Sequence, residues 1–64
     1  MNQPKTKREA QQEISRLVSA AAAEARYAAT CPVGSKQRAR ALLRETTRTR
    51  TADEVRALLL TLPE

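Results

Sequence analysis

Apolar residues recur along the first half of the chain at helical spacing rather than in alternation. No glycine or proline interrupts residues 7–29, and Thr6 and Glu9 have the spacing of a capping box. Successive apolar positions are four and three residues apart, which places them on one face of an α-helix. These positions are Ile14, Val18, Ala21, Ala25 and Ala28. The pattern predicts a first helix over residues 7–29 with Thr6 as its N-cap.

Two shorter helices are predicted after the turn that Pro32 and Gly34 mark. Ser35 is a good N-cap residue, so a second helix is expected over residues 36–47. Threonine and arginine alternate in residues 46–51, which favours a connection there. A third helix is expected over residues 52–61. Its apolar face consists of Val55, Leu58, Leu59 and Leu62.

The predicted fold class is therefore all-α. We expect a small three-helix arrangement in which one long N-terminal helix has two shorter helices folded against it. At about 1.5 Å of rise per residue, the two short helices together match the length of the first. Residues 6–64 form a single helical domain in this interpretation, and residues 1–5 form a flexible basic tail.

The second predicted helix is amphipathic, with a basic face and a core face. The core face is expected to contain Ala39, Leu42, Leu43 and Thr46. Basic residues recur every four positions at Lys36, Arg40, Arg44 and Arg48. Like charges at this spacing repel, and cations at a helix N-terminus are disfavoured by the helix dipole. Both features oppose helix formation. Features that oppose folding without a compensating gain in stability are expected at functional sites.

The net charge of the whole chain, +5, equals that of residues 35–50 alone. We therefore predict that this segment binds a nucleic acid or another anion. The predicted contacts are Lys36, Arg38, Arg40, Arg44, Arg48 and Arg50. A further basic arm is expected at Lys5, Lys7 and Arg8. The alternative is a solvated helix face whose arginine stems cover apolar surface.

Composition argues against several classes of site. The chain has one cysteine and no histidine, which excludes an internal disulfide and disfavours a zinc site. Cys31 follows the C-terminal end of the first predicted helix, where the dipole disfavours a thiolate. Residues 34–36 lack the order of a phosphate-binding Walker loop. We expect no enzymatic activity, cofactor, metal or small-molecule substrate.

A single unpaired cysteine fits a reducing, cytoplasmic setting. No apolar run is long enough for a membrane span, and no secretory signal is expected. A core of this size adds little stability, so a homo-oligomer is predicted, most simply a dimer through the long helix. The predicted interface consists of Ile14, Leu17, Val18, Ala21, Ala25 and Leu60.

Two functions follow from these patterns. The first is a small basic regulator that binds duplex DNA, with the second helix against the phosphates or in the major groove. The first two helices and their turn would then form a helix-turn-helix. The alternative is a helical adaptor or inhibitor that docks on an acidic surface of a partner protein. Tyr27 is the only aromatic residue, which argues against recognition of single strands by base stacking.

Overall fold

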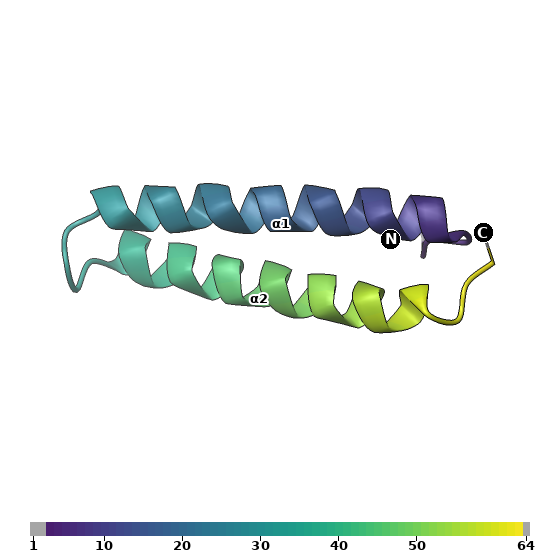
Figure 1. Ribbon diagram of the computed structural model, residues 1–64. Coiled ribbons are helices and arrows are strands. Elements are labelled where there is room, and N and C mark those ends of the chain that lie inside the picture. Colours follow the sequence, from purple (N-terminus) through teal and green to yellow (C-terminus); the bar gives the residue numbers. More distant parts are fainter. Residues whose placement is uncertain (1–2, 64) are drawn as a thin grey trace.

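The computed structural model describes residues 3–63 and contains two α-helices of equal length. Helix α1 spans Lys7–Thr30 and helix α2 spans Lys36–Leu59, with 24 residues in each. The helices lie side by side and antiparallel, so that the two described ends of the chain meet at one end of a rod (Figure 1). The Cα atoms extend over 45 × 17 × 13 Å. The described residues contain no strand.

Side-chain caps and one tight turn define the ends of the hairpin. Thr6 and Ser35 are the N-caps of α1 and α2, as predicted, and accept hydrogen bonds from the backbone N–H groups of Glu9 and Arg38. Between the helices Ser35 N–H donates to Pro32 O, and Gly34 has φ +82°. Glycine adopts this left-handed conformation without steric cost. At the other end of the rod, the N–H of Lys7 donates to the carbonyl of Pro63 at 2.8 Å.

The predicted three-helix arrangement is wrong, because α2 continues without a break through residues 46–51. The hydroxyls of Thr46, Thr47 and Thr51 donate to the carbonyls four residues earlier. Such bonds lie within the helix and leave its backbone ladder intact. Threonine costs at most about 0.7 kcal/mol relative to alanine in a helix, which packing along the whole of α2 overrides. Thr51, which directly precedes the predicted start of a third helix, is accordingly an interior residue of α2.

The contact between the helices follows one continuous pattern, which we call the seam. Seam residues are alternately three and four positions apart, and each is buried or half-buried. In α1 they are Ala10, Ile14, Leu17, Ala21, Glu24 and Ala28. In and after α2 they are Arg38, Ala41, Glu45, Arg48, Ala52, Val55, Leu59 and Leu62. This spacing is that of an antiparallel coiled coil, in which every seam position faces the partner helix.

The predicted core faces coincide with the seam only in part. Ile14, Ala21 and Ala28 of the first predicted helix and Val55, Leu59 and Leu62 of the third lie on it, whereas the face predicted for residues 36–47 does not. Ala39, Leu42, Leu43 and Thr46 are all exposed, and Ala41 is the buried residue in that segment. In α1 the seam uses Leu17 and Glu24 where Val18 and Ala25 were expected. The physical reason is that the seam of this hairpin is built on small and charged residues. A prediction that follows the largest apolar side chains therefore selects a helix face beside the seam in this part of the chain.

The rod divides into two halves of different chemistry. We call residues 19–50 the turn half, and residues 3–18 with 51–63 the terminal half. The apolar cluster lies entirely in the terminal half, and comprises Ala10, Leu17, Ala52 and Val55 with Ile14, Leu59 and Leu62 packed against it. The buried residues of the turn half are Ala21, Ala28 and Ala41. Its remaining seam positions carry charged side chains.

Candidate anion-binding surface

The turn half carries the net charge of the protein. It contains seven basic and two acidic side chains, a net of +5, whereas the terminal half contains five basic and four acidic ones, a net of +1. Residue Glu64 lies outside the described residues and accounts for the difference from the chain total of +5. The positive potential is therefore centred on the first half of α2 and the turn beside it.

An outer stripe on α2 points away from α1. Its members are exposed and follow the same alternating spacing as the seam, on the opposite side of the helix. They are Lys36, Arg40, Leu43, Thr47 and Arg50. Within residues 3–63, none of the three cations makes a hydrogen bond or an ion pair. Of the six predicted DNA contacts, these three therefore have side chains whose charge is not paired with another residue in the described part of the chain.

The other three predicted cations face the seam and contact α1. Arg38 donates from Nη1 to the carbonyl oxygen of Ala28 at 3.3 Å, which ties α2 to the last turn of α1. Arg44 Nε lies 3.0 Å from Glu24 Oε2, and Arg48 Nη2 lies 3.7 Å from Glu24 Oε1. The Glu24 side chain is 18% exposed, whereas those of Arg44 and Arg48 are 46% and 36% exposed. One carboxylate thus neutralises part of the charge of two arginines.

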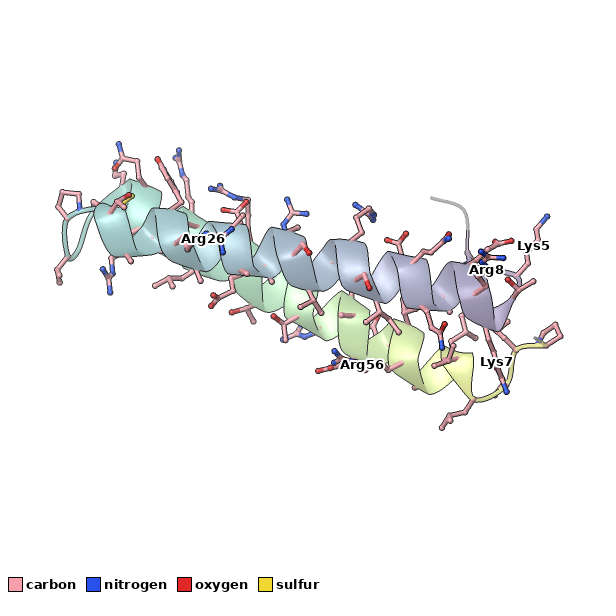
Figure 2. All side chains as sticks on the ribbon, turned by 45° about the horizontal axis from the view of Figure 1, so that its top comes forward. Lys5, Lys7, Arg8, Arg26 and Arg56 are labelled. Carbon is pink, nitrogen blue, oxygen red and sulfur yellow. The ribbon has the colours of Figure 1, made fainter. Side chains whose placement is uncertain are left out.

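The predicted basic arm lies at the far end of the rod from this surface. Figure 2 shows Lys5, Lys7 and Arg8 gathered beside the C-terminal end of α2, whereas Arg26 lies toward the turn. The backbone N–H of Lys5 donates to the carboxylate of Glu9. About 20 residues of helix separate Arg8 from the turn, which corresponds to about 30 Å at 1.5 Å per residue. The arm and the outer stripe are therefore separate basic regions.

The residues of the predicted protein interface divide between the inside and the outside of the hairpin. Leu17 and Ala21 are buried against α2, and Ile14 packs against the same core. Val18 is 44% exposed and Leu60 is 83% exposed, while Ala25 is half-buried. The face of α1 that contains Ile14, Leu17 and Ala21 is therefore already covered by α2. The dimer itself stays a prediction.

Two arginines were missed by the sequence reasoning. Arg26 is exposed on α1 within the turn half, and no contact within residues 3–63 engages it. Arg16 pairs with Glu13 on its own helix, and this hydrogen bond raises the pKa of Arg16 above its ordinary value. Arg16 also lines a groove with Arg44 and Arg48 of α2. Only the antiparallel register brings these three together, so no local sequence signal identifies the group.

Other kinds of site have little support in the described part of the chain. Residues 3–63 contain no cluster of three or more side chains suited to a metal ion. They also contain no helix that is both long and apolar enough to cross a membrane. Cys31 is half-buried at the C-cap of α1, with Sγ 3.4 Å from the carbonyl oxygen of Tyr27. Comparison with protein-family models, curated proteins and solved structures found no match.

Proposed function

We propose that the protein is a small non-enzymatic regulator that binds the phosphate backbone of duplex DNA through the outer stripe of α2. The observation that carries this proposal is the set Lys36, Arg40 and Arg50, three exposed cations that no contact within residues 3–63 engages. Ion pairs between phosphates and such side chains release condensed counterions, which drives association in a sequence-independent manner. A cytoplasmic setting, suggested by the single cysteine, is part of the proposal.

The hairpin favours backbone contact over base reading. A helix-turn-helix requires two helices at a steep angle, so that the second protrudes into the major groove. Here α1 and α2 are antiparallel and in contact along their whole length (Figure 1). The helix-turn-helix interpretation is therefore wrong for this chain. A rod presenting one basic face suits the outside of a duplex, where phosphates position a protein without specifying sequence.

The six predicted contacts should contribute unequally. Lys36, Arg40 and Arg50 are the principal contacts in this proposal. Arg44 and Arg48 share Glu24, so that moving either one to a phosphate leaves the carboxylate less well paired. Arg38 donates to a backbone carbonyl of α1, and its removal should therefore lower stability more than affinity.

A salt series with matched charge variants tests the proposal. Fluorescence anisotropy is measured on two unrelated duplexes with the wild type and with Lys36→Ala, Arg40→Ala and Arg50→Ala. Each variant should weaken both complexes similarly and reduce the slope of log affinity against log salt by about 0.9. Arg8→Ala removes the same charge at the far end of the rod and should leave the slope within about 0.3 of the wild type.

Two outcomes would contradict this proposal. The first is a wild-type protein that fails to bind either duplex at low salt. The second is an Arg8→Ala slope that falls as far as that of Arg40→Ala, which would indicate attraction by total charge and not by the outer stripe. Circular dichroism of each variant provides the folding control.

A partner protein with an acidic surface is the second candidate. The favouring observation is that large apolar side chains are exposed beside the cations: Leu42 is 40% exposed and Leu43 is 67% exposed. Such side chains add nothing to phosphate binding but contribute to protein interfaces. In this alternative, Leu43→Ala weakens the complex by accelerating its dissociation, whereas Arg40→Ala weakens it by slowing association. A duplex affinity that is insensitive to Leu43→Ala is expected under the DNA proposal.

A further inference from the structure

The hairpin has two long sides, one on each side of the seam. Successive residues of an α-helix are about 100° apart, so the residue before a seam position and the residue after it point to opposite sides. Arg16 of α1 and Arg44 and Thr47 of α2 directly precede seam residues, and together they line one groove. The thirteen residues that directly follow the seam residues from Ala10 to Leu59 therefore form the other side, which we call the neutral face.

The neutral face carries very little charge although it is exposed. Only Asp53 and Arg56 among its thirteen residues are charged, and they pair with each other, with Asp53 Oδ1 2.9 Å from Arg56 Nη1. At the equivalent positions on the opposite side, six residues are charged, among them Arg40 of the outer stripe. All neutral-face residues except the half-buried Ala25 are exposed. Such a face suits a partner surface that is itself largely uncharged.

Three large apolar side chains are exposed on the neutral face, at even intervals along the rod. Val18 is 44% exposed, Leu42 is 40% exposed and Leu60 is 83% exposed. On α2 the two leucines are about 27 Å apart at 1.5 Å per residue. Their midpoint is residue 51, beside Ala52, which belongs to the same apolar cluster as Leu17. Val18 directly follows Leu17, so it lies level with the midpoint between the two leucines.

This spacing makes the neutral face complementary to itself. Consider a two-fold axis that lies within the face, runs across the rod and passes through Val18. It relates two antiparallel copies whose neutral faces meet, with α1 on α1 and α2 on α2, as in a four-helix bundle. Val18 then meets Val18 of the second copy, and Leu42 of each copy meets Leu60 of the other. Ala22 and Ala25 beside Val18 allow the helices to approach closely.

Charge and size also favour a second copy as the occupant. The antiparallel arrangement places the two turn halves, each with a net charge of +5, at opposite ends of the bundle, where they repel least. The Cα atoms extend 45 Å along the rod and 17 Å in its second dimension. A face of this size is comparable with the about 800 Å² that each partner contributes to a stable interface. Association would also extend the small apolar core of one hairpin.

We infer that the neutral face binds a second copy of this chain in an antiparallel arrangement, with Val18 at the two-fold axis and Leu42 and Leu60 meeting on either side of it. Of the interface predicted from the sequence, only Val18, Ala25 and Leu60 lie on this face, because the other residues of that set face α2. The inference does not rest on duplex binding, since no residue of the outer stripe belongs to the neutral face.

Sedimentation equilibrium of the wild type at physiological salt tests the association. We expect a reversible monomer–dimer equilibrium at micromolar concentrations. Val18→Lys brings two like charges together at the axis and should raise the dissociation constant at least about hundredfold. Val33→Lys is the matched control, because Val33 is 89% exposed in the turn, and should change the dissociation constant less than about threefold.

Two results of this experiment would overturn the inference. The first is a wild type that stays monomeric up to millimolar concentration, which would leave the neutral face to a different protein. The second is equal dimerisation by the Val18→Lys and Val33→Lys variants, which would place the interface elsewhere. Circular dichroism confirms that both variants are folded.

Cross-linking tests the orientation, and it decides alone if Val18→Lys does not fold. Cys31 is replaced with serine throughout, so that each protein carries one chosen cysteine. A mixture of the Leu42→Cys and Leu60→Cys proteins should form cross-linked dimers with a short bismaleimide, whereas neither protein alone should do so. Cross-links within either protein alone, or none in the mixture, would overturn the antiparallel arrangement.

Discussion

The terminal half and the turn half are built on the same backbone and the same seam spacing, but with different side chains. In the terminal half Ile14 and Leu17 pack against Val55 and Leu59. In the turn half the seam consists of three alanines together with Glu24, Arg38, Glu45 and Arg48. The terminal half carries the apolar cluster and a net charge of +1, whereas the turn half carries a net charge of +5. Stability and charge are therefore concentrated at opposite ends of one hairpin.

This difference shows how so short a chain can sustain a dense positive patch. Burial of apolar area contributes about 25 cal/mol per Å², so leucine and valine stabilise a seam more than alanine does. Charged seam residues also lose hydration, which their pairing only partly offsets. The terminal half must hold the hairpin together while the turn half tolerates repulsion among its cations. In the turn half, the Ser35 cap and Gly34 form the connection between the two helices.

The largest expected effect comes from removing the apolar side chain at the centre of the core. Leu17 is 4% exposed, so Leu17→Ala should lower the free energy of unfolding by about 2–4 kcal/mol and unfold much of the population. Leu43→Ala is the matched control, because Leu43 is exposed, and should change it by less than about 0.5 kcal/mol. Urea denaturation followed by circular dichroism measures both. Equal losses would mean that the two halves are not distinguished by their cores.

Hydrogen exchange sharpens the comparison without any substitution. We expect the amides of Leu17 and Val55 to exchange about tenfold more slowly than those of Ala28 and Ala41, which corresponds to about 1.4 kcal/mol in opening free energy. The reason is that opening the turn half exposes mainly alanine and charged side chains. Rates are corrected for intrinsic exchange before they are compared. Uniform protection along both helices would indicate that the hairpin opens only as one unit.

The smallest expected effect concerns the charged seam. Replacing both Glu24 and Arg48 with leucine should raise the free energy of unfolding by about 1 kcal/mol, since apolar pairs often exceed ion pairs at half-buried positions. Glu24→Leu alone should lower it by about 1 kcal/mol, because Arg44 and Arg48 then lose their shared partner. Thermal and urea unfolding of the three proteins provide the measurement. A double variant no more stable than Glu24→Leu would show that the charged seam stabilises the turn half.

Local sequence signals predicted the parts of this fold that depend on neighbouring residues. The Thr6 and Ser35 caps, the turn at Pro32 and Gly34, and the extent of α1 follow from capping and backbone preferences over a few positions. The concentration of charge in residues 35–50 is likewise a property of the sequence alone. Leu60, which the pattern leaves off the predicted apolar face of residues 52–61, is 83% exposed.

The pattern of Val55, Leu59 and Leu62 predicted the face that the end of α2 turns to α1, but only the tertiary structure decided the continuity of α2 and the face of residues 36–47 that meets α1. Residues 46–51 have modest helix propensity and no large apolar side chain, so local reasoning ended a helix there. The seam passes through them because Arg48 and Ala52 face α1 in the antiparallel register. The same register assigns Arg44 and Arg48 to Glu24, leaves Lys36, Arg40 and Arg50 outside, and brings Arg16 to the groove. These relations join residues some 20 to 30 positions apart, and pairing at that range is set by the packing of one helix on the other.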